Sequence, residues 1–100
     1  MDGARSFVLS AHAQERTARR NISSDTIARV LTLANNRVHV GGGIKACTVT
    51  RNRLQRLRGV VTIAEAERMR SVVVLVHPAS GTVITAFRGL GAPSRRYRRR

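Results

Sequence analysis

The chain has 100 residues, enough for one domain, and 42% of them are hydrophobic, an ordinary share for a folded globular chain. Nineteen Lys and Arg residues against five Asp and Glu give a formal net charge of +14, and every basic residue except Lys45 is arginine. A genomic preference for Arg over Lys explains part of this bias but not the shortage of acidic residues. Self-repulsion of this size favours a polyanionic partner, and the planar guanidinium suits phosphate because it makes paired hydrogen bonds and keeps its proton.

The composition also argues against several classes of protein. No run of about 18 apolar residues predicts a membrane span, and the first ten residues lack a signal-peptide layout. The scarce aromatics, Phe7, Phe87 and Tyr97, argue against a surface on which bases stack. A lone cysteine, Cys47, cannot form an internal disulfide and suits a reducing cytosol, so we predict a cytoplasmic protein. Its apolar-leaning position in an expected strand indicates a buried thiol rather than a nucleophile.

The first third of the chain predicts two helices. Residues 7–9 are apolar and form either a brief strand or the lead-in to a helix, and residues 12–20 are helix formers that are polar almost all round. Ser23 or Ser24 is the expected N-cap of the second helix, with Asp25 at its positive end. Its apolar residues recur at helical spacing: Ile27, Val30, Leu31 and Ala34. We expect Asn35–Asn36 to end it, because Asn tolerates the left-handed cap conformation.

The middle of the chain predicts a hairpin followed by two short helices. Residues 37–40 and 44–49 alternate in polarity on either side of Gly41-Gly42-Gly43, so we expect two strands joined by a glycine turn. Residues 51–58 predict a short basic helix with Leu54 and Leu57 as its apolar anchors. The stretch from Thr62 to Glu65 matches a capping box and predicts a helical turn through Met69, although residues 60–61 also allow a strand.

The last third predicts the core of the sheet. Residues 72–76 are an unbroken apolar run, as expected of a central strand, and residues 77–81 read as a turn. Residues 82–88 predict the closing strand, in which strict alternation places Val83, Thr85 and Phe87 on one face and Ile84 and Ala86 on the other. We therefore predict one α+β domain over residues 1–91, with N-terminal helices packed on a small, curved, mainly antiparallel sheet in sequential order. Residues 92–100 are expected to form a basic, flexible tail.

Two motifs resemble one known family. The stretch from Ser10 to Arg16, followed by Arg20-Asn21-Ile22-Ser23, a helix and finally Val83-Ile84-Thr85-Ala86-Phe87, resembles the domain of unknown function 4258 family. Its pattern is roughly H-A-x-x-R-x-x-x-R-x-I-S near the start and V-I-T-x-[FY] in the last strand. Many members carry glycine where this chain has Asn21, which a left-handed turn tolerates nearly as well. The resemblance implies an architecture like that of the RelE/barnase group of ribonucleases, and a toxin-like ribonuclease role beside a small acidic antitoxin.

The candidate site follows from what RNA cleavage requires: a base for the 2′-hydroxyl, an acid for the leaving oxygen, and cations for the phosphate. His12 is the best acid or base because imidazole titrates near neutral pH, and on a helix Arg16 lies one turn beyond it. Thr85 is expected to orient the substrate, so the candidate catalytic residues are His12, Arg16 and Thr85. The expected RNA-binding residues are Arg19, Arg20, Arg88, Arg95, Arg96 and Arg98.

Plainer interpretations remain open for these residues. His12 is equally suited to capping the start of the helix, Glu15 to pairing with Arg19, and Thr85 to an ordinary half-buried place in a strand. His39 and His77 are weaker candidates, and no cluster has metal-ligand spacing, so we predict no metal or other cofactor. Two functions are therefore carried forward. The first is a metal-independent endoribonuclease acting on RNA, including ribosome-bound mRNA, and the alternative is a non-catalytic nucleic-acid-binding module.

Overall fold

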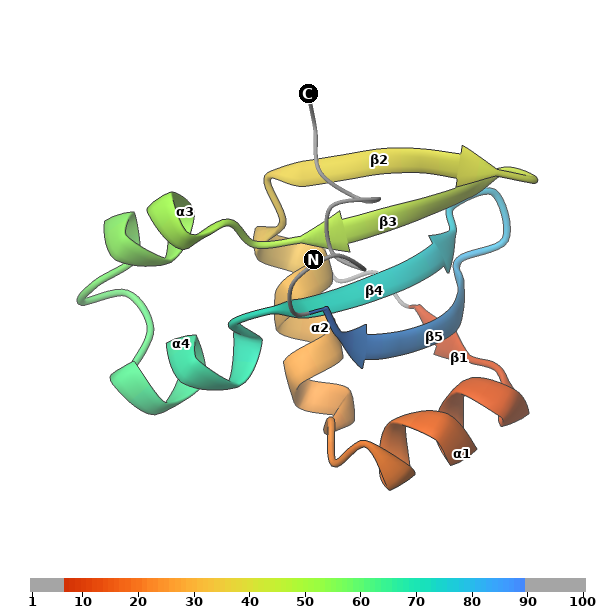
Figure 1. The fold of residues 1–100 in the computed structure, drawn as a ribbon, viewed down its shortest axis with the longest axis horizontal. Helices are drawn as coiled ribbons and strands as arrows, with labels where there is room; N and C mark the ends of the chain where they lie inside the picture. Colours follow the sequence, from red (N-terminus) through yellow and green to blue (C-terminus); the bar gives the residue numbers. More distant parts are fainter. Residues whose placement is uncertain (1–6, 90–100) are drawn as a thin grey trace.

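Helices pack against a five-stranded sheet in the computed structural model, which describes residues 7–89 (Figure 1). The α+β class predicted from the sequence is therefore confirmed. In chain order the elements are β1 Val8–Leu9, α1 Ala11–Arg19, α2 Ser24–Leu33, β2 Asn36–Gly41, β3 Ile44–Thr48, α3 Arg51–Arg56, α4 Ile63–Met69, β4 Val72–His77 and β5 Thr82–Arg88. The domain boundary at residue 91 and the tail over 92–100 lie outside the described residues.

The sheet has the order β1-β5-β4-β3-β2. The strands from β2 to β5 pair antiparallel with their neighbours in sequence, as predicted. The short strand β1 adds to the outer edge of β5 in parallel, with Val8 opposite Thr82 and Leu9 opposite Val83. The apolar stretch at residues 7–9 is therefore a strand rather than the lead-in to a helix. Because β1 is only two residues long, it covers only the first part of the β5 edge.

Helix α1 begins at the N-cap Ser10, whose hydroxyl accepts a hydrogen bond from the Ala13 backbone N–H at 3.0 Å. The sequence suggests a helix that is polar nearly all round, but Ala13 and Thr17 are buried and form its packing face. The Thr17 hydroxyl donates to the Ala13 carbonyl, so this buried polar group is satisfied within the helix. Small side chains at these two positions allow α1 to lie close against β5.

Helix α2 begins after Ser23, which accepts from the Thr26 N–H, so Ser23 rather than Ser24 is the N-cap. The helix ends at Leu33, because Ala34 turns to extended backbone with φ −58° and ψ 132°. The prediction that Asn35–Asn36 ends the helix in a left-handed conformation is wrong, since neither residue has a positive φ. Asn35 instead exchanges two hydrogen bonds with Thr50, which ties the end of α2 to the start of α3.

Left-handed backbone does occur at Asn21, which has a φ of 60° and forms the turn between α1 and α2. We predicted that Asn21 tolerates a left-handed turn, and its conformation confirms this prediction. Asparagine adopts this region at lower cost than most residues because its short polar side chain can hydrogen-bond locally.

The predicted hairpin and both short helices are present. Strands β2 and β3 flank the glycine turn, and Leu57, the C-cap residue that follows α3, is buried. The capping box at α4 is complete: the Thr62 hydroxyl accepts from the Glu65 N–H at 3.0 Å, and the Glu65 carboxylate accepts from the Thr62 N–H at 2.9 Å. Residues 60–61 form no strand beyond a single bridge between Val61 and Arg58.

Strand β5 contains a β-bulge that the alternating pattern does not reveal. Val83 pairs with Val76 and Thr85 pairs with Leu75, so Ile84 is the extra residue. Beyond the bulge the faces are exchanged, and Val83 and Ala86 both join the same buried core with no exposed surface. The prediction that Val83 shares a face with Thr85, and Ala86 with Ile84, is therefore wrong.

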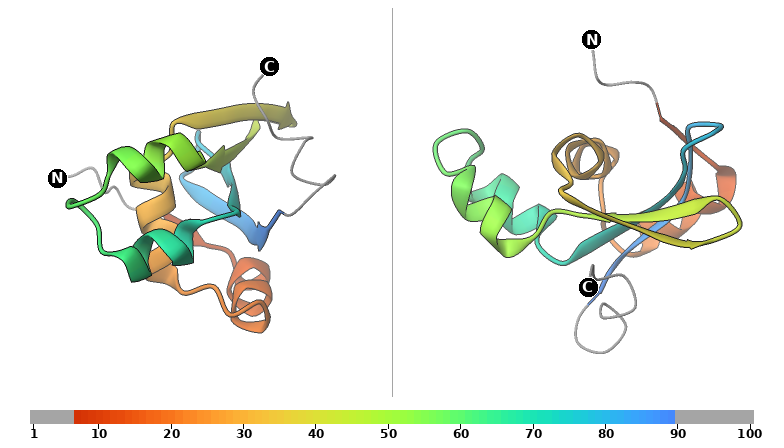
Figure 2. Two further views of the ribbon diagram at one scale, coloured as in Figure 1. Left: turned by 60° about the vertical axis from the view of Figure 1, so that its left-hand side comes forward. Right: turned by 90° about the horizontal axis from the view of Figure 1, so that it is seen from above.

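The main core lies between α2 and one face of the sheet (Figure 2). Its largest fully buried side chains come from α2, α4, β4 and β5: Ile27, Val30, Met69, Val72, Val74 and Val83. Burying a side chain of this size contributes roughly 1.5–3 kcal/mol, so this layer supplies most of the driving force for folding. Helices α3 and α4 lie together beyond one end of the sheet, away from α1 (Figure 1). None of the helices in residues 7–89 is long and apolar enough to cross a membrane.

Candidate functional site

Arg20 joins the end of α1 to the middle of β5. Its Nη1 donates hydrogen bonds to Thr85 Oγ1 at 3.2 Å and to the Ala86 carbonyl at 2.9 Å. The carbonyl lies on the outer side of β5, beyond the two residues that β1 covers, so no strand is there to satisfy it. A guanidinium takes that place because it offers several donors in one plane. The structure thus brings together two residues that the sequence analysis singled out, Arg20 and Thr85.

The other two candidate catalytic residues, His12 and Arg16, lie on α1 with Arg20. The three are spaced four residues apart, which places them in one row along the helix. His12 and Arg16 are exposed, and within residues 7–89 the side chain of neither makes a hydrogen bond or ion pair. Because Ser10 is the N-cap, His12 does not cap the helix. Both ends of α1 are attached to β5, through Arg20 and through the Ser10 N–H, which donates to the Val83 carbonyl at 3.3 Å. We name the row His12, Arg16 and Arg20, together with Thr85, the α1–β5 site.

The remaining predicted RNA-binding residues do not gather there. Arg19 forms a surface ion pair with Glu15 at 3.6 Å, the plainer interpretation that the sequence left open. Pairs this exposed contribute at most about 0.5 kcal/mol, so Glu15 competes only weakly for Arg19. Arg88 lies at the end of α4, where its Nη1 donates to the Arg68 and Arg70 carbonyls at 3.4 and 3.5 Å. Arg95, Arg96 and Arg98 lie outside the described residues.

The cations of the described chain greatly exceed their acidic partners. The three ion pairs within residues 7–89 join Arg19 to Glu15, Arg29 to Glu65 and Arg70 to Glu67. Each described glutamate is therefore already matched to an arginine, and most of the remaining arginines have no acidic partner in this part of the chain. The excess charge thus lies on the folded domain as well as on the sequence beyond residue 89.

The other histidines and the cysteine lie apart from the α1–β5 site. His77 ends β4 rather than lying within the turn, and its Nδ1 is 3.3 Å from Ser80 Oγ, while His39 is exposed on β2. Cys47 is buried on β3 as predicted, and burial raises the pKa of its thiol despite the opposing charges of Arg37 and Lys45. Within residues 7–89 no three His, Cys, Asp or Glu side chains gather into a group suited to a metal ion.

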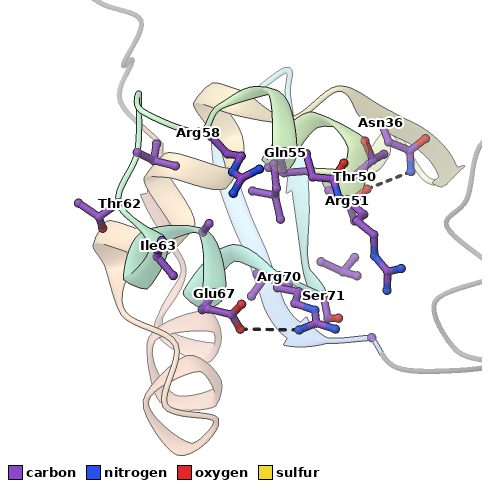
Figure 3. Close-up of a pocket in the computed structure, with 18 of the residues that line it drawn as sticks. Asn36, Thr50, Arg51, Gln55, Arg58, Thr62, Ile63, Glu67, Arg70 and Ser71 are labelled. Carbon is purple, nitrogen blue, oxygen red and sulfur yellow. Dashed lines mark hydrogen bonds and ion pairs between the residues drawn. The ribbon is translucent and has the colours of Figure 1, made fainter.

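A large cavity that the sequence analysis missed opens between α3, α4 and the end of the sheet (Figure 3). Its volume is about 1100 Å³, at the upper end of the range for ligand pockets. Arg51, Arg58 and Arg70 line it together with apolar side chains that include Leu54 and Val72. The sequence held a partial signal, the predicted basic helix over residues 51–58. It did not reveal that α4 folds back beside this helix and closes a cavity.

Comparison of the chain with protein-family models, with curated proteins and with solved structures finds no match. The resemblance to the domain of unknown function 4258 family and to RelE/barnase ribonucleases therefore stays a prediction.

Proposed function

We propose that this protein binds RNA and cleaves it at the α1–β5 site without a metal ion. The observation that carries the proposal is the pair of hydrogen bonds from Arg20 to Thr85 and Ala86. They hold the end of α1 against the strand, and so hold the exposed His12 and Arg16 in a defined place beside β5. A cleavage site needs such rigid support, because a small misplacement of catalytic groups costs much of the rate.

Binding is supported by the cations of the domain. Each glutamate in residues 7–89 is already paired with an arginine, and the unpaired arginines are exposed at several places on α1 and α3. Guanidinium groups bind phosphate oxygens through charge-assisted, paired hydrogen bonds. RNA is favoured over DNA by the proposed chemistry, because the 2′-hydroxyl that the reaction uses is present only in RNA.

In the proposed reaction His12 is the base. Its neutral imidazole takes the proton of the 2′-hydroxyl, and the 2′-oxygen then forms a bond to phosphorus while the bond from phosphorus to the 5′-oxygen breaks. The products are a 2′,3′-cyclic phosphate and a 5′-hydroxyl, whose proton comes from water, and the imidazolium returns its proton to solvent. Arg16 stabilises the charge that grows on the phosphate oxygens. Thr85 orients the substrate, since its hydroxyl has acceptor capacity left after receiving the Arg20 hydrogen bond.

The test is incubation of the purified protein with end-labelled RNA in EDTA across a salt series. We expect cleavage to products that end in cyclic phosphate, and affinity that falls steeply as salt rises, because binding releases counterions. Failure of the native protein to bind RNA even in dilute buffer would overturn the proposal.

A second function, binding of nucleic acid without cleavage, is favoured by two observations at the α1–β5 site. His12 is the only histidine of the α1–β5 site, and Arg20 already donates to two protein oxygens, so its capacity for phosphate is reduced. Salt-sensitive binding without product in the same assay would establish this alternative.

We also propose the cellular setting that the sequence suggested. The buried lone thiol of Cys47 suits a reducing cytoplasm. A toxin-like role would require a small acidic antitoxin, and the strongly cationic domain is complementary to such a partner. The test is whether an acidic protein encoded beside this chain copurifies with it and blocks cleavage. Cleavage that persists in the presence of that protein would count against the antitoxin role.

A further inference from the structure

We infer that the cavity between α3, α4 and the sheet is a second binding site, which takes a phosphate-bearing nucleotide of the RNA strand held at the α1–β5 site. This inference rests on the proposed function and adds a subsite to it. The cavity is large enough for a nucleotide, at about 1100 Å³, and opens to solvent between two short helices (Figure 3).

The lining combines the two kinds of group that a nucleotide needs. Arg51, Arg58 and Arg70 supply cations for phosphate oxygens, and in Figure 3 the Arg58 side chain extends into the space between α3 and α4. Arg51 and Arg58 are exposed, and within residues 7–89 the side chain of neither forms a hydrogen bond or ion pair. Arg70 is held by Glu67 at 3.7 Å, a weak pair that a phosphate can displace.

The polar groups of the cavity favour a nucleotide over an acidic peptide. Its wall includes amides and hydroxyls as well as arginines: Asn36, Thr48, Thr50, Gln55 and Ser71. Asn36 and Thr48 already hydrogen-bond each other, and Thr50 caps α3. We therefore assign the base edge to Gln55 and Ser71, which can both donate and accept hydrogen bonds, whereas a carboxylate side chain only accepts. The apolar side chains of Leu54 and Val72, which also line the cavity, suit contact with the face of a base.

The cavity also lies at the end of the same strand that carries Thr85. Gly89 follows β5 directly and lines the cavity, and its N–H donates to the Ser71 carbonyl at 2.7 Å. Thr85 and Gly89 are four positions apart in extended chain, a span of about 13 Å. Arg88 lies between them and donates to the Arg70 carbonyl. A short single strand of RNA therefore reaches from one site to the other, whereas a dinucleotide, which has one phosphodiester, can give a phosphate to only one of them.

Ser71 gives a further reason to assign function to this place. It has a φ of 64°, a left-handed conformation that glycine would adopt without strain. Ser71 belongs to the turn that joins α4 to β4, where glycine or asparagine commonly holds such a conformation, and here a serine holds it and also lines the cavity. We assign the Ser71 hydroxyl to ligand binding in the cavity.

The experiment measures the affinity of the full chain for a fluorescent octanucleotide and a fluorescent dinucleotide of RNA. We expect the double variant Arg51→Ala, Arg58→Ala to bind the octanucleotide roughly tenfold more weakly and to lose much less affinity for the dinucleotide, which can still place its one phosphate at the α1–β5 site. The slope of log affinity for the octanucleotide against log salt concentration should become shallower by roughly 0.7 for each lost phosphate contact. The matched control is Arg56→Ala, Arg68→Ala, which removes the same charge from α3 and α4 at exposed residues that do not line the cavity.

A second variant keeps the test valid if the first is unstable. Ser71→Gly relieves the backbone strain, so it should fold at least as well as the native chain while binding the octanucleotide a few-fold more weakly. Equal losses in the two double variants would overturn the subsite but leave RNA binding in place. Failure of the native chain to bind either oligonucleotide would overturn the proposed function and the subsite with it. Competition by poly-glutamate that matches RNA and depends on Arg51 and Arg58 would assign the cavity to a protein partner instead.

Discussion

Arg20 and Thr85 are 65 positions apart in the chain, and a hydrogen bond of 3.2 Å from Arg20 Nη1 to Thr85 Oγ1 joins them. The same nitrogen donates to the Ala86 carbonyl at 2.9 Å. One side chain at the end of α1 therefore satisfies an edge carbonyl of β5 and positions a hydroxyl of the candidate site. If the proposed function is correct, this contact serves both stability and function, so it is the first place to test.

Arg20→Ala should lower the free energy of unfolding by about 1–2 kcal/mol, because it removes two hydrogen bonds from a charged donor that is only partly exposed. Arg20→Lys should recover only part of this loss, since an ammonium lacks the planar fork. A double-mutant cycle with Thr85→Val, measured by urea denaturation, should give a coupling energy of about 0.5 kcal/mol or more. Arg19→Ala is the control, with an expected change of less than about 0.5 kcal/mol. Strict additivity of the two substitutions would contradict the contact.

His12→Ala and Arg16→Ala should each reduce RNA cleavage by about 100-fold or more, the usual contribution of a positioned acid or base or of a charge-stabilising donor. Binding should stay within a few-fold of the native chain, because many other arginines remain. The rates are measured in single-turnover cleavage of labelled RNA, and affinity by filter binding. His39→Ala on β2 is the control and should leave cleavage unchanged. Undiminished cleavage by the His12→Ala, Arg16→Ala double variant would exclude this site.

Glu65 should make the stability of the domain depend on acid pH. The Thr62 backbone N–H, which donates to its carboxylate, lowers the pKa of Glu65 most, and the Arg29 guanidinium lowers it further. A carboxyl whose pKa is lower when folded binds fewer protons in the native state, so its contribution is present above its unfolded pKa and lost below it. The free energy of unfolding should therefore fall as the pH drops from about 5 to about 3.

Glu65→Gln provides the comparison for this prediction. The glutamine can still accept from the Thr62 N–H but does not titrate, so the fall in stability over this pH range should be shallower than in the native chain. The measurement is urea denaturation at several pH values for both proteins. Curves that stay parallel throughout would show that Glu65 does not cause the dependence.

Cys47 should resist thiol reagents in the folded protein. It is 2% exposed and burial raises its pKa, so little thiolate is present or accessible at neutral pH. Labelling by a disulfide reagent should be slow in buffer and should accelerate with urea in step with unfolding monitored by circular dichroism. A thiol introduced by Ser24→Cys, at an exposed position of α2, is the control and should react at once. Rapid labelling of Cys47 in the native state would contradict its place in the core.

Several features followed from short stretches of sequence because the interactions that create them are local. The N-cap at Ser23 and the capping box from Thr62 to Glu65 each join a side chain to a backbone group three residues away. Asn21 adopts its left-handed turn for a similarly local reason, and the apolar run over residues 72–76 predicted the central strand β4. The row of His12 and Arg16 could be predicted from helical spacing alone, because residues four positions apart lie on the same face of a helix.

The sequence by itself thus determined the α+β class, most element boundaries and the charge of the surface. It also supplied, as candidates for catalysis, three of the four residues that form the α1–β5 site. Only the tertiary structure decided which face each residue of β5 presents, because the bulge at Ile84 arises from pairing with β4. It likewise decided that Arg20 meets Thr85, and that α3 and α4 enclose a cavity lined by arginines. These features join segments far apart in the chain, and no local pattern encodes the geometry with which such segments pack.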